Sequence, residues 1–250
     1  MRLSREVVDA NQTAVSKSPA MVPPKRMPGL FIAIEGIDGS GKSSVSEALA
    51  SSLVAKGRNV VLTREPGGTA IGEQIRTIVL SENSTGMTPE TETLLFAAAR
   101  AQHVAEVINP SLARNDIVIC DRYIDSSLAY QWGGRGLTKE SILSVQALAT
   151  GGLMPDLRIL LDLPVKFALG RRFADSDRSN RLDNEHVQFY ERVRAAYLTL
   201  AAMDAPGWMV VNAERPQKDV AVDVIRRVES AINQHFGYAT MAHVDWRKPG

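Results

Sequence analysis

Short apolar runs alternate with longer stretches of helical periodicity along most of this chain. The apolar runs have the length and flanking turn residues of buried strands, and they cover residues 30–35, 59–64, 116–121, 157–163 and 208–212. Apolar residues at helical spacing cover residues 42–56, 70–80, 89–114, 139–149, 165–174, 184–203 and 217–235. Strands separated by helices predict an α/β fold in which helices cover both faces of a mainly parallel sheet.

The two ends of the chain lack this alternation. Residues 1–29 mix charges of both signs with several prolines and contain no apolar segment of a secretory signal, so we expect a disordered extension. Residues 238–250 are not periodic and are expected to form a C-terminal tail. No internal repeat or sharp boundary divides the part between them, which predicts one domain over residues 30–237.

Composition narrows the class of protein only a little. The hydrophobic content of 44% and charged content of 23% are ordinary for a globular protein. A net charge of +1 implies no general affinity for nucleic acid or membrane, and no apolar run approaches the ~18 residues of a membrane span. The single cysteine, Cys120, lies in an apolar run and is expected to be a buried, inert thiol in a reducing, cytoplasmic setting.

Residues 36–43 carry the most specific chemistry. They read Gly-Ile-Asp-Gly-Ser-Gly-Lys-Ser and match the phosphate-binding loop pattern G-x-x-x-x-G-K-[ST] between a predicted strand and helix. The glycines allow backbone N–H groups to approach phosphate oxygens, and the helix that follows directs its N-terminus at the same anion. Lys42 is expected to reach the β- and γ-phosphates of a nucleoside triphosphate, and Ser43 to face Mg²⁺.

Arginines and carboxylates follow the other predicted strands. Ligands of a parallel sheet gather at the carboxyl ends of its strands, where this chain has Arg64 with Glu65 and Asp121 with Arg122. A kinase for a small phosphorylated acceptor needs such cations for its second anion, and Arg100 and Arg135 are further candidates. The guanine-reading N-K-x-D segment of GTPases is absent from the sequence.

Four further segments resemble those of thymidylate kinases in both their order and their spacing. They are Thr-Arg-Glu-Pro-Gly-Gly at 63–68, Leu-Leu-Phe-Ala-Ala-Ala-Arg-Ala-Gln-His at 94–103, Asp-Arg-Tyr-Ile-Asp-Ser-Ser-Leu-Ala-Tyr-Gln at 121–131 and Gly-Gly-Arg-Gly at 133–136. The resemblance extends over about residues 30–236. It implies transfer of the γ-phosphoryl group of ATP to dTMP, giving dTDP for dTTP synthesis. It also implies Mg²⁺, a homodimer and a P-loop NTPase fold with a five-stranded parallel sheet, of the nucleoside monophosphate kinase type.

The resemblance also implies roles for residues of the acceptor site. Arg122 would grip the acceptor phosphate, and Asp121 would act as a Walker-B-like carboxylate near Mg²⁺. Many relatives have an aspartate immediately before the arginine at position 100, whereas this chain has Ala99, which removes a local partner of that arginine. The residues implied in dTMP binding are Arg64, Glu65, Phe96 stacked on thymine, Arg100 on its carbonyl edge, Arg122, Ser127, Tyr130 beside the sugar, and Gln131.

The donor site is implied in the same way. Its ATP contacts would be Gly36, Ile37, Asp38, Gly39, Ser40, Gly41, Lys42, Ser43, Ser44 and, against adenine, Arg171. Asp38 would lie near the reacting phosphates. Some family members place a catalytic arginine directly after this acidic residue, where the present chain has Gly39. The charged stretch 171–183 resembles the lid over ATP, so Arg178 and Arg181 become the candidates for stabilising the transferring phosphoryl group.

Two other functions share the phosphate-binding loop. A deoxynucleoside kinase would use a hydroxyl acceptor and a general base in place of the second phosphate site. A regulatory P-loop ATPase would bind a protein partner and need no acceptor nucleotide.

The Glu65–Pro66 bond, in the turn after the second strand, is a candidate cis peptide.

Overall fold

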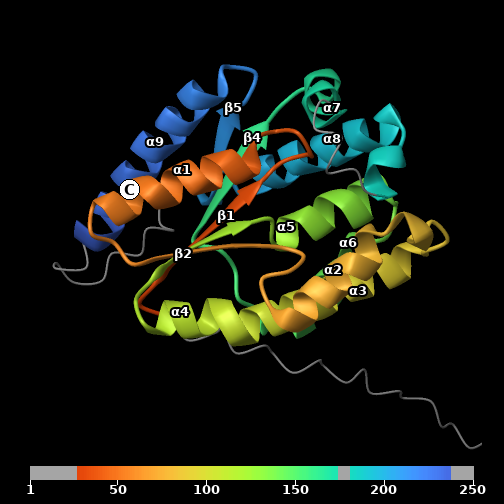
Figure 1. The fold of residues 1–250 in the computed structure, drawn as a ribbon, viewed down its shortest axis with the longest axis horizontal. Coiled ribbons are helices and arrows are strands. Elements are labelled where there is room, and N and C mark those ends of the chain that lie inside the picture. The colour runs from red at the N-terminus through yellow and green to blue at the C-terminus, as the bar shows by residue number, and fades with distance from the viewer. Residues whose placement is uncertain (1–26, 174–180, 238–250) are drawn as a thin grey trace, which may run out of the picture.

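A five-stranded parallel sheet forms the centre of the molecule (Figure 1), described here from a computed structural model that covers residues 27–173 and 181–237. Its strands lie in the order β2-β3-β1-β4-β5. They are β1 (Leu30–Glu35), β2 (Val60–Arg64), β3 (Ile117–Asp121), β4 (Leu157–Asp162) and β5 (Trp208–Asn212). All four neighbouring pairs are parallel. The predicted fold class is confirmed, and each strand agrees with its predicted range to within one residue at either end.

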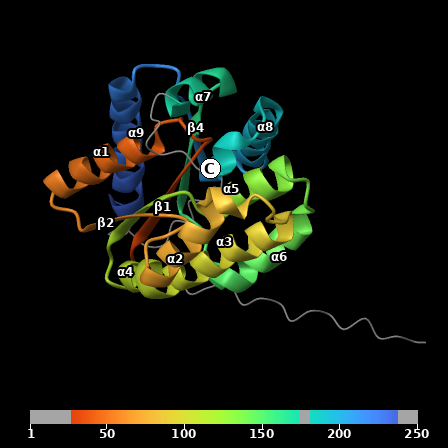
Figure 2. The same cartoon turned by 45° about the vertical axis from the view of Figure 1, so that its right-hand side comes forward.

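Helices connect the strands and cover the sheet. They are α1 (Lys42–Ala55), α2 (Ala70–Leu80), α3 (Pro89–His103), α4 (Asn109–Ala113), α5 (Ile124–Ser127), α6 (Lys139–Thr150), α7 (Val165–Phe173), α8 (Val187–Met203) and α9 (Gln217–Gly237). Helices α1 and α9 lie side by side, and α2, α3 and α6 form a separate group (Figure 2). Among the described residues, the 3₁₀ turns η1 (Glu82–Ser84), η5 (Arg181–Asn184) and η6 (Ala205–Gly207) complete the connections.

Two helical predictions need correction. The helix predicted over residues 89–114 is divided into α3, a π-helical segment η2 (Val104–Ile108) and α4. Pro110 lies at the start of α4 and has no N–H for a regular helical bond to the preceding turn, which accounts for the wider turn before it. The sequence pattern also missed α5 and the π-helical segment η3 (Leu128–Gly134), which carry part of the predicted acceptor site.

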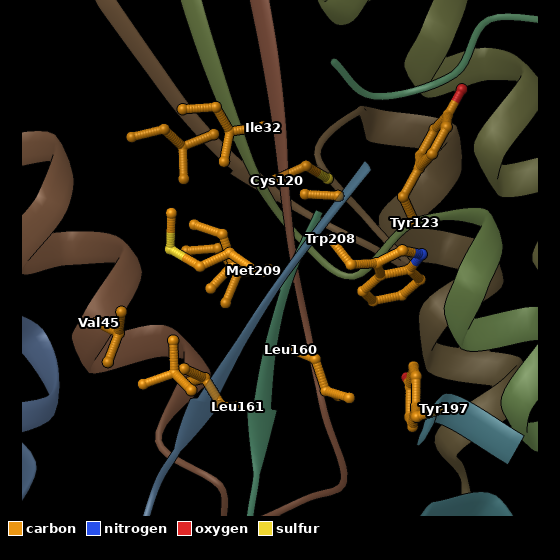
Figure 3. Packing of buried hydrophobic residues seen from close by; sticks show 14 of the residues in the cluster. Ile32, Val45, Cys120, Tyr123, Leu160, Leu161, Tyr197, Trp208 and Met209 are labelled. Carbon is orange, nitrogen blue, oxygen red and sulfur yellow. The ribbon is translucent and has the colours of Figure 1, made fainter. Parts of the chain in front are cut away.

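The core lies on both faces of the sheet. Figure 3 shows Ile32, Leu161 and Met209 directed towards Val45 of α1, while Leu160, Trp208 and Tyr123 point to the opposite side, where Tyr197 of α8 lies. All of these side chains are buried. Every residue of β1 is buried, so the strand that leads into the phosphate-binding loop is fixed on both faces.

Cys120 is buried within this core, as the sequence predicts. Burial raises the pKa of its thiol well above the ordinary value, and nearby carboxylates add to the shift, so the reactive thiolate is disfavoured.

Within the described ranges, no helix combines the length and apolar character needed to cross a bilayer. The predicted extension up to residue 26, the tail 238–250 and the central lid residues 174–180 lie outside the described residues.

Candidate active site

The loop between β1 and α1 has the backbone geometry of an anion cradle. Gly36, Gly39 and Gly41 have φ angles of 143°, 81° and 94°. Gly41 is the N-cap of α1, and because it has no side chain to accept a hydrogen bond, the first N–H groups of the helix are left for an anion. Lys42 is buried, and its Nζ donates to the Ile37 carbonyl at 3.0 Å. The loop is thus folded as a phosphate site would require.

Gly39 occupies a position that no side chain can share. A Cβ atom there would collide with the carbonyl oxygen of Ala168 in α7, and the positive φ disfavours any L-residue in addition. The packing of α7 against the loop therefore excludes an arginine at this position.

Burial and then the positive charge of Arg122 lower the pKa of Lys42, to about 8, while Asp38, Asp121 and Glu35 oppose the shift. Burial would raise the pKa of Asp38, but Arg122 and Lys42 outweigh that effect and hold the pKa below its usual range. The ion pair between Arg122 Nη2 and Asp38 Oδ1 is 2.8 Å long. The cleft therefore brings two cations close together, and Asp38 forms an ion pair with one of them.

Ser43 and Asp121 form the candidate metal position. Ser43 Oγ donates to Asp121 Oδ2 at 2.8 Å. The second oxygen, Oδ1, is buried and has no hydrogen-bond partner among the described residues. A hydroxyl beside a carboxylate with one unused oxygen is the kind of donor set that Mg²⁺ prefers, so these residues fit the ion.

Arg122 follows β3 in a left-handed backbone conformation, with φ 73°. Its Nη2 donates to Asp38 and to the Tyr130 hydroxyl at 3.1 Å, and its Nη1 donates to Ser126 Oγ at 3.1 Å and the Tyr197 hydroxyl at 3.3 Å. The Tyr130 hydroxyl also donates to Asp38 at 2.9 Å. The guanidinium predicted to hold the acceptor phosphate is therefore fixed from several sides and lies next to the phosphate-binding loop.

Glu35, the last residue of β1, lies beneath this arginine and is one of the site residues that sequence reasoning missed. Burial raises the pKa of its carboxyl to about 7, and the charge of Asp125 adds to the shift. The available signal was a carboxylate at the end of an otherwise apolar, fully buried strand, directly before the loop.

Arg100 is almost completely buried at the other end of the cleft. Its Nε donates to Glu65 Oε2 at 2.6 Å, its Nη1 to Ser127 Oγ at 2.9 Å and Gln146 Oε1 at 2.5 Å, and its Nη2 to the Tyr123 carbonyl at 2.9 Å. Glu65 supplies the carboxylate that Ala99 does not. Gln146, on α6, was not predicted because its distance along the chain gives no sign of this contact.

His103 is another residue whose role the sequence did not reveal. It is completely buried, with Nδ1 3.0 Å from Glu65 Oε1 and Nε2 2.7 Å from Thr63 Oγ1. Because it lies three residues after Arg100 on α3, it holds the other oxygen of the same carboxylate. The peptide bond between Glu65 and Pro66 is cis, as expected.

One cleft of 1020 Å³ joins the predicted donor and acceptor residues. The predicted residues that line it are Asp38, Gly39, Gly41, Lys42, Ser43, Ser44, Arg64, Glu65, Phe96, Arg100, Asp121, Arg122, Ser127, Tyr130, Gln131 and Arg171. Gly36, Ile37 and Ser40 do not line it and are buried. Phe96 is half-buried and Arg64 is exposed, in an ion pair of 3.1 Å with Glu73.

The lid candidates are placed unequally. Arg171 Nη1 donates at 3.2 Å to the carbonyl of Ala213, just after β5. Arg181 is buried and donates to Glu92 Oε2 at 2.5 Å and the Val79 carbonyl at 3.1 Å, and it does not line the cleft. Arg178 lies outside the described residues.

Glu92, which the sequence did not single out, is the centre of a buried cluster. Besides Arg181, it accepts from Arg135 through both carboxylate oxygens at 3.2 Å and from Gln131 Nε2 at 2.8 Å. Arg135, a candidate for holding an anion, is thus engaged by Glu92 and also by Glu185 at 2.5 Å. It serves here as a structural cation between α3 and the segment before α8.

A phosphate-binding loop and a buried arginine in one cleft, at the carboxyl ends of a five-stranded parallel sheet, define a P-loop phosphotransferase of the nucleoside monophosphate kinase type. The order β2-β3-β1-β4-β5 puts β1 between β3 and β4. The loop after β1 and Arg122 after β3 are therefore neighbours although they are far apart in sequence.

Comparison with known proteins makes the assignment more specific. The family model for thymidylate kinase matches residues 34–224. The thymidylate kinase of Desulforudis audaxviator is 50% identical over 207 residues, which are 82% of this chain and 93% of the relative. The thymidylate kinase of Leifsonia xyli is 46% identical over 209 residues, or 84% of this chain and 99% of the relative. The chain belongs to the thymidylate kinase family.

The contact between Gly39 and Ala168 generates a prediction. Gly39→Ala should reduce kcat/KM for ATP about a hundredfold, because the loop must shift its N–H groups and a displacement of about 1 Å has effects of this size. Gly57→Ala is the matched control, since Gly57 has a φ of 76° but nothing lies within 4 Å of its added Cβ. The control should cost only about 1–2 kcal/mol of stability and no activity. Steady-state kinetics and thermal unfolding check both variants, and similar kinetics in the two would contradict the expectation.

Proposed function

We propose a residue-level mechanism for the ATP-dependent phosphorylation of dTMP to dTDP, the nucleoside monophosphate kinase reaction of dTTP synthesis that belongs to this family. The observation that carries it is the position of Arg122, which shares the cleft with Lys42 and is one hydrogen bond from loop residue Asp38. In the reaction, an oxygen of the dTMP phosphate attacks the γ-phosphorus of ATP. The bond from that phosphorus to the β,γ-bridging oxygen breaks, and ADP leaves.

The donor nucleotide would be held by the loop and Lys42. The pKa of Lys42 is lowered by burial and by Arg122, so its charged form lacks sufficient negative charge nearby. The triphosphate would supply that charge. Ser43 and Asp121 would hold Mg²⁺, which when bound neutralises charge on the phosphates and helps to align them. Arg171, fixed near Ala213 at the end of β5, would lie against adenine.

The acceptor phosphate would be held by Arg122, with help from Arg64. In the structure, the Nη2 group of Arg122 is bonded to Asp38 and Tyr130. An incoming phosphate carries more charge than one carboxylate, so it competes with Asp38 for the guanidinium. The planar fork of arginine suits such a bidentate contact.

The thymidine part would occupy the deeper half of the cleft. Phe96, half-buried in the lining, has the exposure needed for its ring to stack on the base. Four hydrogen bonds from Arg100 leave one of its five N–H donors for the base edge. Ser127 and Gln131 would complete the polar contacts, and Tyr130 would exclude a ribose hydroxyl at the 2′ carbon.

We also propose that the enzyme works as a cytoplasmic homodimer. The support is a set of exposed apolar side chains on the adjacent helices α3 and α6, namely Leu94, Leu143 and Leu148. Apolar groups in such a group are typical of a surface that another protein covers. Sedimentation velocity should give twice the mass of the chain, and a monomer at micromolar concentration would contradict the dimer.

The reaction is tested by measuring ADP release from Mg-ATP with dTMP, dUMP, dCMP, AMP and thymidine as separate acceptors. We expect the highest kcat/KM with dTMP and loss of turnover when magnesium is omitted. Turnover of thymidine but not of dTMP would indicate a deoxynucleoside kinase instead. ATP hydrolysis that dTMP does not alter would indicate a regulatory ATPase.

Arg122→Ala should raise the KM for dTMP about tenfold to a hundredfold, as expected for the loss of hydrogen bonds to a charged group. The Kd for ATP should change little, because Arg122 is not part of the loop. Arg226→Ala is the control, since this arginine is exposed and forms a surface pair with Asp223. An unchanged KM for dTMP in Arg122→Ala would contradict the assigned role.

A lid arginine should stabilise the transferring phosphoryl group, since Gly39 cannot be replaced by one. Arg181 would have to leave its ion pair with Glu92 to do so, and we therefore expect the larger effect for Arg178. Arg178→Ala should lower kcat about 10³-fold with little change in either KM, and Arg181→Ala should lower it much less. The reverse order in single-turnover kinetics would assign the role to Arg181.

A further inference from the structure

Glu35 forms a layer of hydrogen bonds directly below the acceptor-phosphate arginine. Its carboxylate is completely buried and is not part of the cleft lining. Oε1 accepts from the backbone N–H of Tyr123 at 2.8 Å, and Oε2 accepts from Ser126 Oγ at 2.6 Å and the Tyr197 hydroxyl at 3.0 Å. Three donors, from Tyr123 after β3, from α5 and from α8, therefore surround one carboxylate that no nucleotide would contact.

The same two hydroxyls continue the chain of hydrogen bonds to Arg122. Its Nη1 donates to Ser126 and to Tyr197. Each hydroxyl has one proton, so a hydroxyl that donates to Glu35 presents its lone pairs to the guanidinium. The two hydroxyls also lie 2.8 Å from each other, so one of them can donate to the other while Glu35 accepts from its neighbour. The carboxylate thus sets the direction of the hydroxyl pair, and the pair holds one edge of Arg122. Its other edge, Nη2, is the one that faces loop residue Asp38.

Glu35 also fixes the backbone on which Arg122 stands. A left-handed conformation is unfavourable for an arginine by about 1–2 kcal/mol and requires support from its surroundings. The Arg122 N–H donates to the Ile34 carbonyl at 3.0 Å, and the next N–H, that of Tyr123, donates to Glu35. Both bonds come from the end of β1, so that strand determines where β3 turns and where the arginine points.

We propose that Glu35 is a positioning residue of the acceptor site, whose carboxylate orients Arg122 through Ser126, Tyr197 and the Tyr123 N–H to receive the phosphate of dTMP. This inference rests on the proposed role of Arg122. The carboxylate form is the effective one, because a protonated acid would lose one of the acceptor positions that the three donors require.

The environment of Glu35 makes this role dependent on pH. Burial and then the charge of Asp125 raise its pKa, to about 7, while Ser126, Arg122 and the Tyr123 N–H oppose the shift. Lys42, Cys120 and Tyr197 are the other titratable groups that interact with it. The fraction of Glu35 in the carboxylate form therefore increases as pH rises through about 7. The kcat/KM for dTMP should rise over the same range.

Glu35→Gln tests the inference, since it keeps the shape of the side chain and removes its charge. At pH 8 the KM for dTMP should rise about tenfold to a hundredfold, while the KM for ATP and the inhibition constant of thymidine, which has no phosphate, should change less than about twofold. The rise of kcat/KM near pH 7 should also flatten. The ionisation of the dTMP phosphate itself contributes equally to the profiles of wild type and variant, so it cancels in the comparison.

Asp125→Asn is the matched control, a buried carboxylate next to Glu35 that interacts with Arg158 instead of Arg122. It should leave the KM for dTMP at pH 8 unchanged and move the rise in kcat/KM to lower pH, because it removes the like charge. Tyr197→Phe provides a second measurement if Glu35→Gln does not fold. It should raise the KM for dTMP about two- to tenfold and leave thymidine inhibition unchanged.

The inference is overturned if Glu35→Gln, or Tyr197→Phe in its place, keeps the wild-type KM for dTMP. It is also overturned if ATP and thymidine are affected as strongly as dTMP, which would indicate a purely structural role. Arg122→Ala separates this result from failure of the proposed function. If that variant impairs dTMP and Glu35→Gln does not, only the role of Glu35 is wrong; if neither does, the acceptor site itself is misassigned.

Discussion

The ion pair between Arg122 and Asp38 joins the phosphate-binding loop to the acceptor side of the cleft, and the charge balance of the site depends on it. Arg122 contributes to the lowered pKa of Lys42, and both cations hold Asp38 in its ionised form. Without nucleotides, one loop carboxylate lies between two cations in a largely buried site. Such an arrangement favours ligands that bring negative charge to both sides at once, as a triphosphate and a monophosphate do.

The arginines that would contact the nucleotides are held by carboxylates placed behind them. Glu65 holds Arg100 and is itself held by His103, while Glu35 acts on Arg122 through two hydroxyls. A buried ion pair contributes little to net stability, because desolvation offsets most of the attraction. These pairs are better understood as fixing direction. When most N–H donors of a guanidinium are already hydrogen-bonded, the remaining donors have a fixed direction. Binding a ligand then costs less side-chain entropy.

Much of this site could be predicted from the sequence because the residues that touch nucleotides follow strand ends. The rule for parallel sheets gathers Lys42, Arg64 and Arg122 at one edge, and the structure has their side chains lining one cleft. The fold was predictable for a related reason, since β1 and β3 are continuous apolar runs. The helix α5 and segment η3 were missed because Ser126, Ser127 and two glycines weaken the helical pattern over residues 124–134.

The residues that could not be predicted are those that hold the cleft-lining side chains in place without lining the cleft themselves. Glu35, Glu92 and Gln146 make their decisive contacts with side chains at least 39 positions away. No local pattern distinguishes Glu92 and Gln146 from surface residues, and the apolar strand before Glu35 indicates its burial but not its partners. The reason that Gly39 carries no side chain is likewise a tertiary one. Spacing shows only that a glycine is present, whereas the approach of α7 shows that the loop has no room for an arginine. Because α7 leads directly into the stretch that contains Arg178 and Arg181, the helix that excludes a cation from the loop also begins the segment that would supply one.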